Sequence, residues 1–328
     1  MESTIIVLKQ VISMCLMAAI SYILVEKNKI SPQATKSFSG ILLYVVTPCV
    51  ILSSMQRPFI AEEAWGLGAA LLLSLVLQLI FIGLAHLIIP KKNNLNIGVE
   101  RFAMVMSNTG YIGIPMAQAV LGPDGVFFIS ANIIVFNLIL FSYARLQLLR
   151  DGIRHGKLAE VDLSLRKQIR HCLINPASIS AAVGFILYFL QISLPSVLMT
   201  VVDSFYSINT ALSMIVVGIL LAQTELKPIF LNTRLLRITF CRNILCPLVA
   251  VLLLAVLDLS PFLANAQVLK SALVIGMAAP CAVATAFMAD LFGADGFYGS
   301  QLVANSTIYC IVTMPLLYFI WQSVSALF

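Results

Sequence analysis

Long apolar stretches, separated by short polar segments, run along the whole chain. Five of them precede the polar segment 150–171 and five follow it: 4–25, 38–55, 66–89, 102–121 and 125–148, then 174–192, 205–223, 236–257, 269–291 and 297–320. Most have about the 20 residues that a helix needs to cross the hydrocarbon core of a bilayer. The pattern therefore predicts an all-α membrane protein with ten transmembrane helices.

The composition agrees with this prediction and excludes several other classes. Of the 328 residues, 60% are apolar and 10% are charged, whereas an ordinary soluble domain is about 45–50% apolar and about 25% charged. The seven cysteines form no CxxC pair and the three histidines lie far apart, so we expect neither a metal site nor a cofactor. We also expect no nucleic-acid partner, because the basic residues are confined to short clusters between apolar stretches.

The basic clusters predict the orientation in the membrane. With ten spans, 16 of the 20 Lys and Arg residues fall in loops on one side, and only Lys9 and Arg57 fall on the other. Loops rich in Lys and Arg stay in the cytoplasm. The sequence therefore predicts a multi-pass protein of the cell membrane with a cytoplasmic central loop and both termini outside.

The two halves repeat four features in the same order, which predicts an inverted repeat. The features are a basic residue that opens a span, a proline inside that span, a GxDG turn after it, and an asparagine in the next span. They are Arg101, Pro115, Gly122 to Gly125 and Asn132 in the first half, and Lys270, Pro280, Gly293 to Gly296 and Asn305 in the second. We divide the chain into a first five-helix repeat at 1–149, a cytoplasmic linker at 150–172 and a second repeat at 173–328.

The fourth and ninth spans are poor continuous helices, because each combines a proline with nearby glycines. We expect both to break near the middle of the membrane, where the N-terminus of a half-helix and its free N–H groups can bind an anion. Such interruptions at matching places of two halves are typical of transporter sites, although a mere kink is the alternative for either span alone. The candidate substrate-binding residues are Asn108, Thr109, Gly113, Pro115, Pro280, Cys281, Thr285, Asn132 and Asn305.

Other polar residues inside spans leave alternatives open. The asparagines can serve only to bond neighbouring helices. Arg242 is either functional, as ionisable residues in membranes usually are, or snorkels to the interface. Pro48 in the second span has no counterpart in the seventh, so we interpret it as a structural kink. No enzyme motif occurs in a suitable context, and no carboxylate lies in mid-span, so the coupling ion, proton or sodium, remains open.

The chain resembles the auxin efflux carrier family over its whole length. The resemblance rests on Asn108-Thr109 followed by Gly113 to Met116, on Pro280 followed by Phe287 to Ala289, and on Pro315. It implies two inverted five-helix repeats whose fourth and ninth helices break at prolines and cross, with an organic anion held near the crossing and Asn108 as the crossover asparagine. It also implies elevator transport, with the first, second, sixth and seventh spans as scaffold. The short central loop is similar to that of the bacterial malonate and malate permeases.

Together these features favour a secondary transporter of a small organic anion, such as a mono- or dicarboxylate, that works by elevator-type alternating access in a bacterial inner membrane. A membrane ligand sensor that binds without moving solute is the alternative, and an intramembrane enzyme is a third reading that lacks identifiable catalytic residues. The expected partners are the anion and membrane lipids, and a homodimer is left open.

Overall fold

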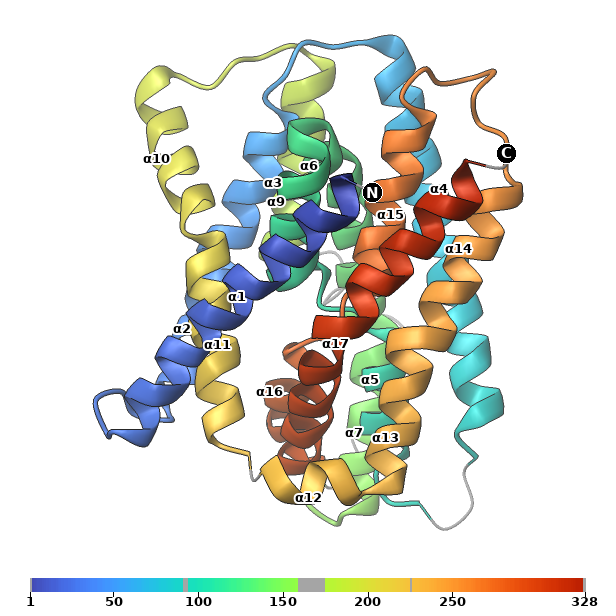
Figure 1. The fold of residues 1–328 in the computed structure, drawn as a ribbon. Coiled ribbons are helices and arrows are strands. Elements are labelled where there is room, and N and C mark those ends of the chain that lie inside the picture. The colour runs from blue at the N-terminus through green and yellow to red at the C-terminus, as the bar shows by residue number, and fades with distance from the viewer. Residues whose placement is uncertain (1, 91–93, 159–174, 225, 327–328) are drawn as a thin grey trace.

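The computed structural model describes residues 2–90, 94–158, 175–224 and 226–326, and these form a bundle of helices (Figure 1). Within this part of the chain the one β-type pairing is an isolated bridge between Ser107 and Cys281. In chain order the helices are α1 (Glu2–Glu26), α2 (Ala34–Ile41), α3 (Thr47–Met55), α4 (Ala61–Ile88), α5 (Ile97–Val105), α6 (Ile114–Ile139), α7 (Arg145–Arg154), α9 (Pro176–Phe189), α10 (Ser196–Ser207), α11 (Asn209–Ala222), α12 (Leu226–Leu231), α13 (Thr233–Phe240), α14 (Cys246–Val256), α15 (Ala266–Ala278), α16 (Ala284–Leu291) and α17 (Gly296–Ser325). The all-helical class expected from the sequence is confirmed.

Seven helical stretches of the described residues are long and apolar enough to cross a membrane. They are Ile5–Glu26, Ala34–Met55, Ala61–Ile88, Thr109–Arg154, Ser196–Ala222, Thr233–Val256 and Gly296–Ser325. The helices Pro176–Phe189 and Ala266–Ala278 are apolar but shorter. The chain is therefore an integral multi-pass membrane protein.

The stretch Thr109–Arg154 is 46 residues long, more than twice the length of one membrane crossing. It is not a single straight helix, because Gly122 adopts φ 67° and ψ −156° and kinks it. This backbone conformation is open to glycine and strained for most other residues. Pro123 follows and has no N–H to continue the hydrogen-bond ladder, so the sequence places the kink at this point.

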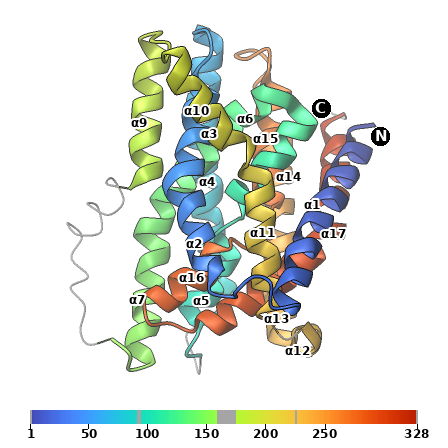
Figure 2. The ribbon, with the colours of Figure 1, turned by 90° about the vertical axis from the view of Figure 1, so that its left-hand side faces the viewer.

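The connections between helices gather at the two ends of the bundle. The N- and C-termini mark one end, and the loops before α4, α10 and α15 lie at that same end (Figures 1 and 2). The loop after α1, the start of α5 and the helix α12 lie at the opposite end. Three of the segments that the charge pattern assigns to one side of the membrane thus share one end of the molecule.

Three helical stretches of the described residues contain four wide π-helical turns, and three of these turns end two residues before a proline. The turns are η1 (Leu42–Val46) before Pro48, η2 (Thr109–Gly113) before Pro115, η4 (Cys241–Leu245) before Pro247, and η3 (Leu140–Ala144) without a proline. A proline lacks the N–H that would bond four residues back and its ring crowds the preceding turn, which a wider turn relieves. The kink expected at Pro48 takes this form.

The helix pair α1 and α11 packs at very short range. A Cβ atom added to Gly218 of α11 would lie 2.1 Å from the carbonyl oxygen of Ala18 and 2.0 Å from the hydroxyl oxygen of Ser21. Small residues allow membrane helices to approach in this way, and dispersion contacts then hold them together. These two helices, from the first and the second half of the chain, therefore form one closely packed unit.

Candidate functional site

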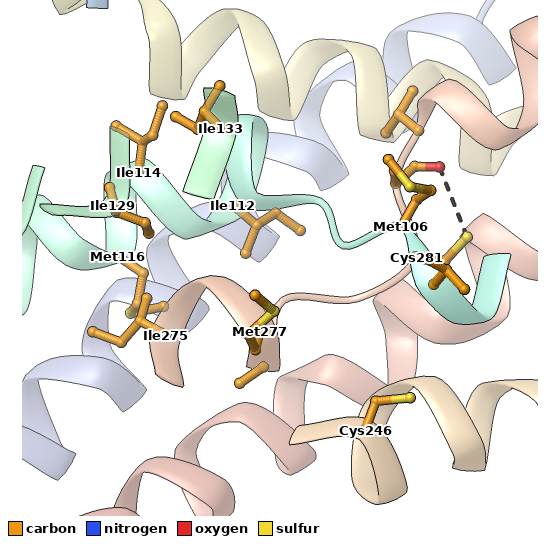
Figure 3. Packing of buried hydrophobic residues seen from close by; sticks show 14 of the residues in the cluster. Met106, Ile112, Ile114, Met116, Ile129, Ile133, Cys246, Ile275, Met277 and Cys281 are labelled. Carbon is orange, nitrogen blue, oxygen red and sulfur yellow. Dashed lines mark hydrogen bonds between the residues drawn. The ribbon is translucent and has the colours of Figure 1, made fainter. Parts of the chain in front are cut away.

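Two interrupted helices cross at the centre of the bundle. The chain leaves α5 at Val105 and is extended until η2 begins at Thr109, and it leaves α15 at Ala278 and is irregular until α16 begins at Ala284. The amide of Asn108 donates to the carbonyl of Pro280 at 2.7 Å, and the amide of Ala282 donates to that of Met106 at 2.9 Å. Figure 3 shows the two extended segments passing side by side, one through Met106 and one through Cys281.

The two prolines expected to mark the breaks occupy different positions. Pro280 lies in the interruption after α15, as expected. The expectation for Pro115 is wrong, because the helix from Thr109 onward runs through it and the break lies at 106–108 instead. A proline near the start of a helix is tolerated, since the first N–H groups have no intrahelical partner.

Thr109 connects the two interrupted helices. Proline at position 280 has no N–H for the carbonyl of Gly276, four residues earlier, and the Thr109 hydroxyl donates to that carbonyl oxygen at 3.1 Å. The same hydroxyl lies 2.7 Å from the Ser107 hydroxyl and 3.3 Å from Oδ1 of Asn132. Thr109 is thus one centre of polar contacts at the crossing.

A second group of polar contacts surrounds Cys281 on the other segment. The amide of Cys281 donates to the hydroxyl oxygen of Ser306 at 3.1 Å, and its Sγ lies 3.1 Å from the hydroxyl of Thr285. The Thr285 hydroxyl also donates to the carbonyl of Ala282 at 2.7 Å, which fixes the first turn of α16. The candidate residues Cys281 and Thr285 therefore lie together at the crossing.

Two buried amide groups at the crossing have no hydrogen-bond partner in the described part of the chain. They are Nδ2 of Asn108, whose side chain is 4% exposed, and Nδ2 of Asn132, which is fully buried. An unpaired buried donor costs about 1–3 kcal/mol. Such groups are expected where a ligand supplies the missing acceptor.

Of the remaining candidates, Asn305 lies away from these contacts and Gly113 lies beside them. Nδ2 of Asn305 donates to the carbonyl of Ile229 in α12 at 3.0 Å, outside the hydrogen bonds of the crossing. Gly113 packs against Thr109 and Ile129, where an added Cβ would find atoms at 3.2 and 3.3 Å. Ser306, next to Asn305, is the residue of this helix that contacts the crossing, through the amide of Cys281.

Arg242 is buried completely, so the snorkelling interpretation is wrong. Among the described residues its guanidinium donates to backbone carbonyls alone, those of Met104 and Val105 at the end of α5 and those of Met277 and Ala279 at the end of α15. The sequence places Arg242 inside a span and leaves its burial open, and nothing in the neighbouring residues indicates these partners.

The comparison with family models decides what kind of protein this is. The model of the membrane transport protein family, which is the auxin efflux carrier family, matches residues 6–318. The chain belongs to this family. A comparison with curated proteins found no match. The resemblance carried by Asn108, Pro280 and their neighbours is confirmed at the level of the family, and the chain is a membrane transporter for a small-molecule substrate.

Two cavities of this auxin efflux carrier family member border helices of the crossing. One, of about 410 Å³, is almost wholly apolar and lies between α1, α11, α17 and Ile112 of η2. The other, of about 380 Å³, is more polar and is lined by Arg57, Gln118 and Tyr206 among others. In the described residues no three His, Cys, Asp or Glu side chains gather as a metal site would require.

Proposed function

We propose that the protein is a secondary carrier of a small organic anion that moves its substrate by elevator-type alternating access and catalyses no chemical reaction. The observation that supports this most is the buried crossing, where two half-helices begin beside unpaired amide donors of Asn108 and Asn132. Each helix N-terminus carries about half a positive charge. Donors together with positive helix ends match a carboxylate.

The chemistry of the crossing favours an anion over a cation. Among the described residues, its hydrogen bonds involve hydroxyls, amides and backbone groups and no carboxylate. A cation site is built from oxygen ligands, usually with Asp or Glu among them. The free groups here are instead N–H donors, which an anion satisfies.

The proposed architecture has ten spans in two inverted repeats, 1–149 and 173–328, joined by the linker 150–172. Part of this linker lies outside the described residues. The repeat is supported by the two matching interruptions and by the GxDG turns, since Gly122 and Gly293 both adopt left-handed conformations, with φ 67° and 70°. Ten spans follow when the kink at Gly122 divides one long stretch and when α9 and the interrupted α15–α16 segment each count as a crossing.

The elevator mechanism requires a moving bundle that slides past a scaffold. In the proposed division, α1 and α11 belong to the scaffold, and η2 and α17 belong to the bundle. The apolar cavity lies between these two groups, so it allows relative movement there. Towards the end of the bundle where the termini lie, the hydroxyl of Tyr206 in α10 donates to Oε1 of Gln118 in α6 at 2.9 Å. The proposed movement would break this hydrogen bond.

The proposed setting is a bacterial inner membrane with both termini outside, as the basic loops indicate. A short central segment is typical of the bacterial permease branch, which makes mono- and dicarboxylates the first substrates to test.

The test is the thermal stability of the purified protein against acetate, malonate, malate and indole-3-acetate. A ligand that binds the native state raises the melting temperature by mass action. We expect one of these acids to stabilise the wild type and not Asn108→Ala. Asn137→Ala is the matched control, because Asn137 is also a buried intramembrane asparagine, and in the described part of the chain its amide bonds just its own helix at Ile133.

Flux of the same acid into liposomes then separates a carrier from a ligand sensor. Uptake by the wild type that is lost in Asn108→Ala supports a carrier. Binding without flux would assign the protein to ligand sensing instead. Stabilisation by a neutral or cationic solute alone would rule out the anion site.

A further inference from the structure

Arg242 joins the two interrupted helices at their C-terminal ends. It lies in η4, is fully buried, and its Nη1 donates to the carbonyls of Met104 at 3.2 Å and Val105 at 3.3 Å. Its Nε and Nη2 donate to the carbonyl of Ala279 at 3.3 and 3.2 Å, and Nη2 also donates to that of Met277. One side chain thus contacts the last carbonyls of both α5 and α15.

The backbone carbonyls that Arg242 contacts compensate its positive charge. A guanidinium stays protonated in proteins, and a buried charge without compensation costs several kcal/mol. Among the described residues no carboxylate forms an ion pair with it. Each helix C-terminus carries about half a negative charge, so the ends of α5 and α15 together supply about −1, which matches the charge of one arginine.

This neutralisation changes the net charge of the crossing. Two helix C-termini and two helix N-termini meet there, and without Arg242 their partial charges would cancel. With Arg242 on the C-termini, the starts of η2 and α16 keep about half a positive charge each, about +1 in total. The unpaired Nδ2 of Asn108 lies at one of these starts and adds a donor without a partner.

We propose that Arg242 determines the charge selectivity of the crossing without touching the substrate. By cancelling both negative helix ends it leaves a net charge that a single carboxylate neutralises. The inference rests on the proposed function and goes further by naming the residue that favours an anionic group over its uncharged analogue.

The local sequence explains how Arg242 reaches this position. Pro247 lies two residues after the end of η4, and the wide turn of η4 relieves the crowding that this proline causes. Asn243 in the same turn donates through Nδ2 to the carbonyl of Ser306 at 2.8 Å, which ties η4 to α17. The ring of Phe81 in α4 lies 5.7 Å from Cζ of Arg242 on another side. The guanidinium is therefore held between α5, α15 and α4.

The experiment compares the affinity for a carboxylate with that for its amide. Wild type, Arg242→Gln and Arg242→Lys are titrated with malonate, malate and indole-3-acetate and with the uncharged amide of each, and the dissociation constants follow from melting temperatures. Arg101→Gln is the matched control, since Arg101 is a buried arginine in the middle of α5 that donates to the carbonyl of Ile89.

We expect Arg242→Gln to weaken carboxylate binding by roughly tenfold, the effect of a unit charge at about 10 Å in an effective dielectric constant of about 20. Its affinity for the amide should stay unchanged. Arg242→Lys, which retains the charge, should stay within about threefold of the wild type, and Arg101→Gln should bind as the wild type does. A purely structural role would change both affinities together and would not be rescued by lysine.

Several results would overturn the inference. One is an Arg242→Gln variant that folds and binds the carboxylate with wild-type affinity, which would leave the proposed function intact. If no carboxylate binds the wild type, the proposed function and this inference both fail. If Arg242→Gln does not fold, Arg242→His replaces it, because imidazole gains its charge near pH 6.5. Its carboxylate affinity relative to the wild type must then rise between pH 8 and pH 5.5, and a constant ratio refutes the role of the charge.

Discussion

Replacing Thr109 by valine should destabilise the crossing, because it removes one hydroxyl that serves both interrupted helices. Thr109 is 1% exposed, and valine has the same shape without the oxygen. The single proton of this hydroxyl reaches the carbonyl of Gly276 at 3.1 Å, with Oδ1 of Asn132 at 3.3 Å as the alternative acceptor. An unsatisfied buried acceptor costs about 1–3 kcal/mol, so Thr109→Val should lose about 1–3 kcal/mol of stability.

Two further variants distinguish this effect from loss of a buried hydroxyl in general. Thr109→Ser keeps the hydroxyl and removes one methyl group, so it should lose only about 1 kcal/mol. Ser130→Ala removes a fully buried hydroxyl that donates to the carbonyl of Phe127 in its own helix at 2.6 Å. Its loss should be about 1 kcal/mol or less.

The assay is unfolding of the purified protein in detergent micelles, followed by circular dichroism over a temperature ramp, together with flux into liposomes. Thr109→Val should have the lowest melting temperature of the three variants and reduced transport. If it melts with the wild type, or if Ser130→Ala is equally destabilised, Thr109 does not join the two helices as the hydrogen bonds indicate.

Two further predictions concern packing and topology. Gly218→Ala should lower the free energy of unfolding by about 1–3 kcal/mol, because its Cβ would lie 2.1 Å from the carbonyl oxygen of Ala18. Gly83→Ala, in open space, should leave that free energy unchanged or raise it by up to about 1 kcal/mol. Equal melting temperatures of the two variants would contradict the close packing of α1 and α11. The topology is tested in a background without native cysteines. The variant Ala264→Cys should react with an impermeant maleimide in intact cells, and the variant Lys29→Cys should react only after permeabilisation. The reverse pattern would show that the proposed topology is inverted.

The class of the fold could be predicted from the sequence because apolar stretches of this length leave few alternatives. The positions of most long helices follow from the same pattern. The helical stretch that ends at Ala222, made of α10 and α11, nevertheless begins at Ser196, earlier than the expected 205, because Pro195 directly precedes it and the polar residues Thr200 and Asp203 do not interrupt it. Single polar residues thus shift an expected boundary without ending a helix.

The place of the breaks was predictable in one half only. Pro280 lies in its interruption because the carbonyl it leaves unpaired, that of Gly276, finds the Thr109 hydroxyl across the crossing. Pro115 is accommodated in the first turns of its helix, where the wide turn η2 precedes it. A proline in a sequence removes the same donor in both cases, and only the neighbouring helix decides whether the chain breaks there.

The partners of polar side chains were the least predictable part of the candidate site. Asn305 and Ser306 are adjacent, so they point about 100° apart on a helix, and the sequence cannot tell which one faces the crossing. The structure turns Ser306 towards Cys281 and Asn305 towards Ile229.

The position of Arg242 was also hard to predict, because its partners are backbone carbonyls, which every residue has and no motif marks. A buried arginine without a nearby carboxylate in the sequence needs another negative partner, and in a membrane the strongest one that the backbone offers is a helix C-terminus. Two interrupted helices that meet provide two such ends close together, enough to balance one guanidinium. An unpaired arginine in a span, combined with two interrupted helices elsewhere in the chain, is therefore the sequence signal that would have predicted its position at the crossing.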